Sequence, residues 1–265
     1  MSQTPASLTI VTAASSNHAG ALRQMLESLR LLSARVECYD IGLTEAEAAS
    51  LPRWDLCTHR RFAYDCYPPY FNVNVAAGEY AWKPVIVADV IDRVLAQATP
   101  CDVLWADAGC FFHALQPIAD AIARTRGLWV RTSAGTMREW THPLMFTYLQ
   151  AGPEAYGDKA NADATLVGFA TGSAPREQRD ALYRDVVQPW RDCALTRDCI
   201  APAGSSRANH RQDQAVLSYL VHRGGYPFAD ATPGAIGVRT KCDRWFYHYL
   251  GFDVPAGLYA WTCLA

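Results

Sequence analysis

An aspartate at the end of an apolar run is the first residue of this sequence that could do chemistry. Asp107 follows the apolar stretch at residues 102–106 and precedes Ala108 and Gly109. A carboxylate at the end of a buried strand can hold a divalent cation that bridges phosphate oxygens, because hard cations prefer oxygen ligands. The alternative is a turn-forming aspartate, which a following small residue and glycine would suit. We treat Asp107 as a candidate catalytic residue and metal ligand.

A second cluster lies at residues 210–214, where one turn carries an imidazole, a guanidinium, a carboxylate and an amide. Asp213 falls in the first turn of an expected helix, where the helix dipole favours negative charge, and that alone would explain it. The cluster nevertheless holds more donors and acceptors than capping requires, so it could orient ligand hydroxyls or hold a reacting group. We predict catalytic roles for Asp213 and His210 and a ligand-binding role for Gln214.

Positive charge in such a site could come from Lys83, Arg60 and Arg61. Lys83 precedes an expected helix whose amino-terminal amides can attract an anion. A phosphate leaving group needs positive charge where its negative charge develops, and the two arginines lie in an aromatic stretch that could form a binding wall. Solvated surface cations, and aromatic packing over the core, are the alternatives. Trp140 is a further, weaker candidate for ligand contact.

The positions of these residues depend on an expected βαβ unit at the start of the chain. Residues 8–13 form a first strand that ends at Thr12 and Ala13, and residues 35–41 form a second. Asn17 caps the helix between them, which implies a right-handed parallel crossover. From fold position alone, we place a nucleotide base or ribose where Ser15, Ser16 and His18 follow the first strand, next to Thr12 and Ala13. No glycine-rich phosphate loop follows this strand, so a dehydrogenase or P-loop enzyme has little support.

The strand at residues 102–106 is apolar enough to be buried on both faces of a parallel sheet. Open α/β sheets bind ligands at the carboxyl edge of their strands, where the strand order reverses. Asp107 is therefore expected at that edge, facing a ligand. The next expected elements are an irregular stretch at 51–74, helices at 84–95 and 115–126, a strand at 127–132, and a segment at 136–150 that covers one side of the site. They are followed by a loop at 153–175 with a short strand at 165–171, and by a helix at 176–190. The last expected elements are a helix from an Asn209–Gln212 capping box to about residue 222 and an edge strand near 236–239.

Composition indicates a single α/β domain over residues 1–265. Half of the residues are hydrophobic and the formal charge is −2, which argues against a nucleic-acid-binding protein.

The amino terminus has no apolar signal core and no run reaches the roughly 18 apolar residues of a membrane span, so we expect a soluble, cytoplasmic protein. Nine scattered cysteines without a C-x-x-C pair indicate reduced thiols and no structural zinc site, although a disulfide-bonded secreted protein is the alternative.

Four motifs together resemble bacterial and eukaryotic GT-A-type nucleotide-diphospho-sugar transferases, which carry W-K-P, W-x-D-x-G and D-Q signatures. Over residues 78–220 these motifs are Tyr80-Ala-Trp-Lys-Pro84, Val103-Leu-Trp-Ala-Asp107-Ala-Gly109, Cys199-Ile-Ala-Pro202 and His210-Arg-Gln-Asp-Gln214. The resemblance implies one GT-A-like, Rossmann-like domain with a central, mostly parallel sheet flanked by helices. It also implies a nucleotide-sugar donor as co-substrate, usually Mn²⁺ or Mg²⁺, and a glycan, lipid-linked or small-molecule acceptor. By position, Asp107 takes the metal or donor role, and Asp213 with Gln214 faces the donor sugar or the acceptor.

The chain departs from the usual D-x-D metal motif of that fold, because Gly109 stands at the second acidic position. A metal at Asp107 then needs a distant ligand, such as His248, or the enzyme is metal-independent and uses Lys83 and the arginines on the diphosphate. The leading hypothesis is a glycosyltransferase, with inversion or retention left open. The alternatives are a nucleotide-sugar-binding protein without transferase activity and another nucleotide-using α/β enzyme. A hydrolase is not favoured, since the sequence contains no G-x-S-x-G elbow.

Overall fold

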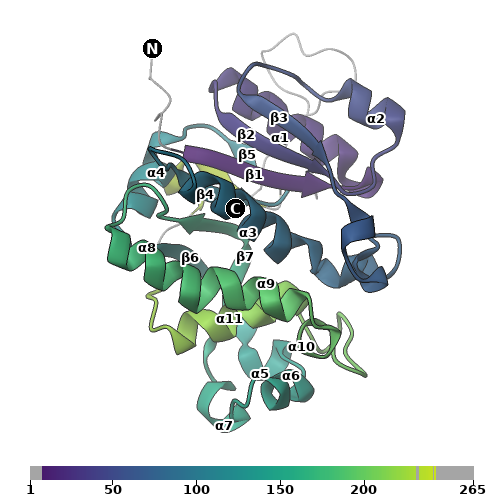
Figure 1. Cartoon of the computed structure of the whole chain (residues 1–265), viewed down its shortest axis with the longest axis vertical. Coiled ribbons are helices and arrows are strands. Elements are labelled where there is room, and N and C mark those ends of the chain that lie inside the picture. The colour runs from purple at the N-terminus through teal and green to yellow at the C-terminus, as the bar shows by residue number, and fades with distance from the viewer. Residues whose placement is uncertain (1–7, 231–232, 241, 243–265) are drawn as a thin grey trace.

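The fold is an α/β sandwich around a six-stranded sheet (Figure 1), seen in a computed structural model that describes residues 8–230, 233–240 and 242. The strand order is β3-β2-β1-β4-β7-β6, with β1 pairing parallel to β2 and β4, and β2 parallel to β3. Only β7 is antiparallel to its neighbours β4 and β6. The strands are β1 Leu8–Ala14, β2 Arg35–Asp40, β3 Cys57–Arg61, β4 Asp102–Ala106, β6 Leu128–Thr136 and β7 Ala160–Phe169. The expected α/β class with a mostly parallel sheet is confirmed.

The first βαβ unit forms as predicted, with helix α1 (Ala19–Leu31) between β1 and β2. The predicted cap is wrong, however. Asn17 lies within a short 3₁₀ turn, Ser16–His18, and its side-chain oxygen accepts a hydrogen bond from the Ser15 hydroxyl at 2.6 Å. His18 occupies the N-cap position of α1 without capping it through its side chain.

The stretch at residues 51–74 is more regular than expected, because it contains the edge strand β3. Most side chains of this strand are exposed or half-buried, so its sequence lacks the apolar alternation by which a strand is recognised. The aromatic rings that follow pack on one another: Phe62 stacks on Tyr67 at 4.8 Å, and Tyr67 on Phe71 at 4.9 Å. Phe62 and Phe71 are buried in the core. For these two rings, aromatic packing over the core, the alternative to a binding wall, is what the structure shows.

Strand β7 occupies the middle of the stretch expected to be a loop at residues 153–175. It runs for ten residues between β4 and β6, longer than the short strand predicted at 165–171. Its first half contains Asn161 and Asp163, both buried despite their polarity. Buried polar residues break the apolar pattern, which is why the sequence understated this strand.

Two layers of helices cover the sheet. Helices α3, α9 and α11 pack on one face, over Val103 and Trp105 of β4, while α1 and α4 pack on the other, over Leu104. Both faces of β4 are therefore buried, as predicted. The helices after α1 are α2 Glu45–Ser50, α3 Trp82–Leu95, α4 Gln116–Ala123, α5 Met137–Trp140, α6 Pro143–Tyr148, α7 Pro153–Tyr156, α8 Arg176–Leu182, α9 Gln188–Ala194, α10 Arg197–Ile200 and α11 Gln212–Arg223, and strands β5 Phe111–Phe112 and β8 Val238–Arg239 form a separate two-stranded sheet.

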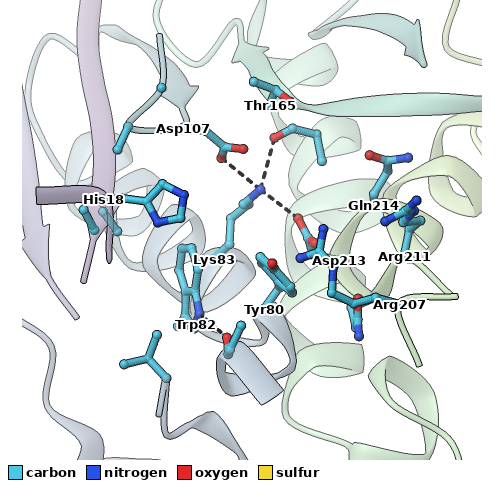
Figure 2. A pocket seen from close by; sticks show the side chains of 18 of the residues that line it. His18, Tyr80, Trp82, Lys83, Asp107, Thr165, Arg207, Arg211, Asp213 and Gln214 are labelled. Atoms are coloured by element: carbon cyan, nitrogen blue, oxygen red, sulfur yellow. Dashed lines mark hydrogen bonds and ion pairs between the residues drawn. The ribbon is translucent and has the colours of Figure 1, made fainter. Parts of the chain in front are cut away.

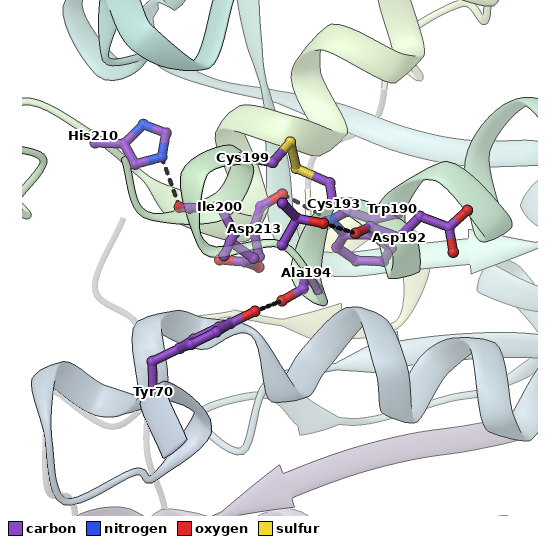
Figure 3. Close-up of a disulfide and its surroundings, with 10 residues drawn as sticks. Tyr70, Trp190, Asp192, Cys193, Ala194, Cys199, Ile200, His210 and Asp213 are labelled. Carbon is purple, nitrogen blue, oxygen red and sulfur yellow. Dashed lines mark hydrogen bonds between the residues drawn. A yellow bond between two sulfur atoms is a disulfide. The ribbon is translucent and has the colours of Figure 1, made fainter. Parts of the chain in front are cut away.

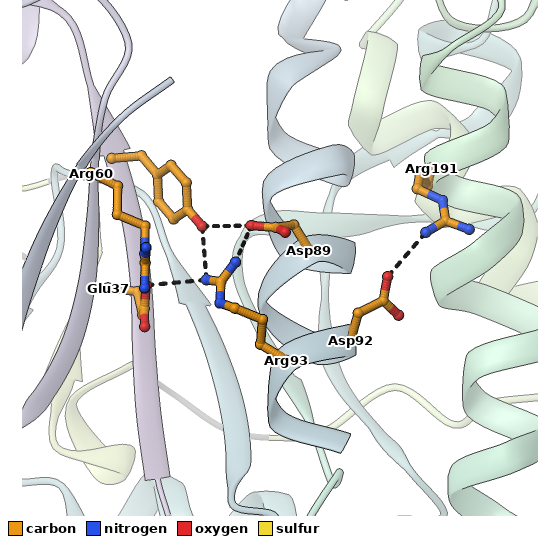
Figure 4. Close-up of polar contacts among 7 residues, drawn as sticks. Glu37, Arg60, Asp89, Asp92, Arg93 and Arg191 are labelled. Carbon is orange, nitrogen blue, oxygen red and sulfur yellow. Dashed lines mark hydrogen bonds and ion pairs between the residues drawn. The ribbon is translucent and has the colours of Figure 1, made fainter. Parts of the chain in front are cut away.

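Charged side chains fix α3 between its neighbours (Figure 4). Arg93 of α3 pairs with Glu37 of β2 at 3.2 Å and with Asp89 one turn earlier on its own helix. On the other side, Asp92 accepts from Arg191 of α9 at 3.2 Å. Partly exposed pairs of this kind stabilise a protein only slightly; here they link α3 to β2 on one side and to α9 on the other.

A disulfide joins Cys193, at the end of α9, to Cys199 in α10 (Figure 3). The expectation of reduced cysteines throughout is therefore wrong for this pair. Cys199 follows Cys193 by six positions, and the turn between the helices brings their Cα atoms to 5.2 Å. In the described ranges no helix has both the length and the apolar character needed to cross a membrane.

Candidate functional site

The strand order reverses between β1 and β4, since the chain continues from β1 to β2 and β3 on one side and places β4 on the other. A cavity of about 490 Å³ opens at the carboxyl ends of these two strands. It is the crevice in which open α/β sheets bind ligands. The lining includes Ala13, Ala14, Ser15, Asn17 and His18 after β1, Tyr80, Trp82 and Lys83 at the start of α3, Asp107 to Gly109 after β4, Asp163 to Thr165 of β7, Trp140 of α5, and Arg207 and Arg211 to Gln214 around the start of α11.

The centre of the cavity is an acid–lysine–acid cluster (Figure 2). The Lys83 ammonium lies 3.0 Å from Asp107 Oδ1 and 2.9 Å from Asp213 Oδ2, and donates to the Ala164 carbonyl at 3.3 Å. Lys83 is only 4% exposed and Asp213 is 5% exposed. Three segments far apart in the chain therefore meet at one charged centre.

Burial and charge act in opposite directions on this cluster. Burial disfavours the charged form of Lys83, but Asp107 and Asp213 outweigh it and hold the pKa of the lysine above its usual value. Burial raises the pKa of Asp213, although the nearby Lys83 opposes that rise. The cluster as a whole combines one cation with two carboxylates, so it favours a ligand with hydroxyl donors or developing positive charge.

Asp107 is the accessible member of the cluster. Its side chain is 38% exposed, and its Oδ1 accepts a hydrogen bond from Trp105 Nε1 at 2.8 Å. The backbone carbonyl of Asp107 accepts a hydrogen bond from Cys110 N–H. The turn expected from the following Ala108 and Gly109 is therefore also formed. The turn and the indole together hold the carboxylate against the cavity.

Lys83 is delivered by a left-handed turn. The five residues from Ala76 to Tyr80 have φ values between +47° and +63°, a conformation that costs free energy for residues other than glycine. Gly78 is required at its centre, because a Cβ there would lie 2.2 Å from the Phe71 carbonyl oxygen. The Trp82 indole donates to the Ala77 carbonyl at 3.0 Å and closes the turn. This left-handed turn ends three positions before the buried lysine.

Asp213 enters the cavity from the first turn of α11, as its position in the sequence predicted. The predicted capping box is wrong, since Asn209 Oδ1 instead accepts from Ser206 N–H at 2.7 Å and closes the preceding loop. The Gln212 amide reaches Glu79 at 3.2 Å, and the Trp190 indole donates to the Asp213 carbonyl at 2.9 Å. The first turn of α11 is held by these contacts on both sides.

His210 is fully buried and is not among the residues that line the cavity. Its Nε2 donates to the Ile200 carbonyl at 2.9 Å, and its Nδ1 accepts from the His142 N–H at 3.2 Å (Figure 3 shows the first contact). Burial lowers the pKa of His210 to about 4. With both ring nitrogens engaged, this histidine anchors the loop before α11.

The structure brings together Ala13, Lys83, Trp140 and Gln214 with both aspartates around the cavity. Three predicted ligand contacts lie elsewhere, because other packing engages them. Thr12 is buried, and its hydroxyl points at the Met25 sulfur. Arg60 and Arg61 lie on the edge strand β3, where Arg60 pairs with Glu37 at 2.5 Å.

Sequence reasoning missed Arg207, Tyr80 and Asp163 as lining residues. Tyr80 belongs to the W-K-P motif, so its place in that motif could have identified it as a lining residue. Asp163 is in the first half of β7, before the start of the strand predicted at 165–171, and Arg207 is in a loop without periodicity. Neither carried a local signal.

The described residues do not assemble the metal site expected at Asp107. In those ranges no group of three His, Cys, Asp or Glu side chains could hold a metal ion. Each lining aspartate also has a buried cationic partner: Lys83 for Asp107 and Asp213, and Arg131 for Asp163 at 2.9 Å. His248, the distant ligand considered from sequence, lies outside the described residues. We derive no chemical step from a metal.

Neither a protein-family model nor a curated protein matches this chain. Among solved structures, it is similar to the galactosyltransferase LgtC in complex with donor and acceptor sugar analogs, at 15% identity and a TM-score of 0.46, covering 83% of this chain and 73% of that one. It is also similar to mouse xyloside xylosyltransferase 1, at 13% identity and a TM-score of 0.42, covering 84% and 83%. A third is core-mannan synthase A from Aspergillus fumigatus in its Mn/GDP form, at 8% identity and a TM-score of 0.45, covering 83% and 71%.

Proposed function

We propose that this protein is a glycosyltransferase that moves a sugar from a nucleotide-sugar donor to an acceptor hydroxyl. The observation that carries the proposal is the acid–lysine–acid cluster at the edge of the sheet where the strand order reverses. Its three members come from the three signatures that resemble nucleotide-diphospho-sugar transferases. Lys83 belongs to W-K-P, Asp107 to W-x-D-x-G and Asp213 to D-Q.

The cavity can accommodate such a donor in a definite direction. Its volume, about 490 Å³, lies within the range of small-molecule and cofactor sites. We place the nucleoside against the wall after β1, formed by Ala13, Ser15 and His18, and the sugar on the cluster. There, the Asp107 carboxylate accepts from sugar hydroxyls, while the three N–H donors of the Lys83 ammonium remain on Asp107, Asp213 and the Ala164 carbonyl.

In the proposed reaction, the bond from the anomeric carbon to the diphosphate oxygen breaks and a bond to the acceptor oxygen forms. The acceptor hydroxyl gives its proton to the departing phosphate oxygen or to bulk water, and a nucleoside diphosphate leaves. Positive charge develops on the sugar in the transition state of such transfers, and the net negative charge of the cluster would stabilise it. Asp107 is the carboxylate that reaches the sugar because it is the exposed member, while Asp213 positions Lys83.

A panel of nucleotide sugars, assayed for hydrolysis and for transfer to simple acceptors, tests this proposal. We expect turnover of at least one donor, and Asp107→Ala to lower it at least about a hundredfold, or roughly 3 kcal/mol of transition-state stabilisation. Asp55→Ala, at an exposed acid outside the cavity, is the matched control and should retain full activity. Donor binding without any turnover would reject the proposal in favour of a nucleotide-sugar-binding protein.

A further inference from the structure

Two arginines at the cavity have their guanidinium groups over aromatic rings. The Arg211 guanidinium carbon lies 4.0 Å from the centroid of the Trp140 ring, and that of Arg207 lies 5.1 Å from the Tyr80 ring. All four residues line the cavity. A guanidinium stacked on a ring keeps its N–H edge free, because its hydrogen-bond donors lie in its own plane.

These two arginines differ from the buried cations beside the cavity. Lys83 and Arg131 are each paired with carboxylates. By contrast, within the described part of the chain neither the Arg207 nor the Arg211 guanidinium has a hydrogen bond or an ion pair. Burial lowers the pKa of Arg211, and the positive charge of Arg207 lowers it further. An anion between them would relieve both costs.

The loop that carries the arginines is held in place before any ligand arrives. Asn209 closes it by accepting from Ser206 N–H and donating to the Gly204 carbonyl at 3.2 Å. His210, between the arginines, is anchored to Ile200 and His142. Binding an anion here therefore requires little ordering of the backbone.

We propose that Arg207 and Arg211 form an acceptor subsite for an anionic group, a phosphate or a carboxylate, so that the acceptor is a charged sugar or sugar-like molecule. The inference rests on the proposed transferase function. Figure 2 shows Arg207 and Arg211 across Lys83 from His18, so they face the nucleoside wall from the other side of the cluster. Arg207 is exposed, where an acceptor would enter. Guanidinium groups bind both anions in a bidentate manner.

Calorimetric titration of the full chain tests the subsite. The nucleoside diphosphate that binds most tightly is first identified from a panel and then held at saturation. Glucose 6-phosphate, glucuronate and neutral glucose are titrated as probes. We expect at least one anionic sugar to bind about tenfold or more tightly than glucose, and the tighter of the two identifies phosphate or carboxylate.

The decisive variant is Arg207→Gln/Arg211→Gln. It should lose the preference for the anionic sugar while its affinity for the nucleoside diphosphate stays within about threefold. The matched control is Arg223→Gln, because Arg223 also lies over a ring, that of Tyr219 at 5.6 Å, but does not line the cavity. This control should keep the preference.

Three results would overturn the subsite. One is equal binding, or no binding, of the charged and neutral sugars by the native chain. A second is an unchanged preference for the anionic sugar in the double variant. The third is a loss of more than about tenfold in nucleoside diphosphate affinity in the double variant, which would assign the arginines to the donor diphosphate. Failure of the transferase proposal itself is seen separately, as absence of donor turnover.

Discussion

Lys83 Nζ lies 2.9 Å from Asp213 Oδ2, and this buried ion pair joins the first turn of α3 to the first turn of α11. The same ammonium lies 3.0 Å from Asp107, which follows β4. A single cation thus organises three elements at the base of the cavity. The stability of the fold and the geometry of the site depend on the same residue.

Removing this cation should destabilise the protein strongly. Lys83→Met leaves Asp213 as a buried carboxylate without its partner, which we expect to cost about 3–5 kcal/mol in the free energy of unfolding. Urea denaturation measures the change. Lys83→Met/Asp213→Asn should recover part of the loss, because the buried negative charge is also gone. Strictly additive effects would contradict a direct pair.

The Trp105 indole should matter for activity more than for folding. Trp105→Phe keeps a buried ring but removes the N–H that holds Asp107, and we expect the turnover rate to fall about tenfold. Trp129→Phe is the matched control, since Trp129 is also buried, whereas the indole that donates to Asp107 is that of Trp105. Steady-state kinetics of both variants measure the effect on turnover, and urea denaturation measures the effect on the free energy of unfolding. Equal turnover in the two variants would contradict the orienting role.

Buried His210 should make the protein sensitive to acid. Its pKa lies near 4 when folded, against 6.5 for the free side chain, so the unfolded chain takes up the proton first. The stabilisation is complete above pH 6.5 and is lost as the pH falls towards 4. We expect a loss of about 2 kcal/mol between pH 7 and pH 5 from this group, measured by urea denaturation.

The control for this prediction is His210→Gln, which can keep a donor to the Ile200 carbonyl but does not titrate. Its free energy of unfolding should fall less over the same pH range than that of the native chain. Parallel pH profiles for the two proteins would assign the acid sensitivity to other groups.

Reduction of the Cys193–Cys199 disulfide should weaken the fold modestly. The bond closes a short loop, for which the loss of chain entropy in the unfolded state corresponds to about 2 kcal/mol. Unfolding should therefore occur at lower urea with dithiothreitol than without it. Cys193→Ala/Cys199→Ala should show no response to the reductant. A native chain that is equally indifferent would contradict a stabilising disulfide.

Much of the fold follows from local patterns. Apolar runs predicted β1 and β4, and the strand–helix–strand spacing predicted that β1 and β2 are parallel neighbours. Strands β3 and β7 were missed or shortened because one is an exposed edge and the other buries Asn161 and Asp163. Local patterns identify a strand only when its environment is uniformly apolar or alternates.

The type and place of Lys83, Asp107 and Asp213 are readable from the chain, because each stands where an apolar element begins or ends. Tertiary packing alone decides that the Lys83 ammonium contacts both carboxylates. It also decides that His210 is buried away from the cavity and that Arg207 and Arg211 lie over aromatic rings. The reason is physical. Burial and turn formation act over a few neighbouring residues, whereas the meeting of element ends depends on how whole helices pack across the sheet.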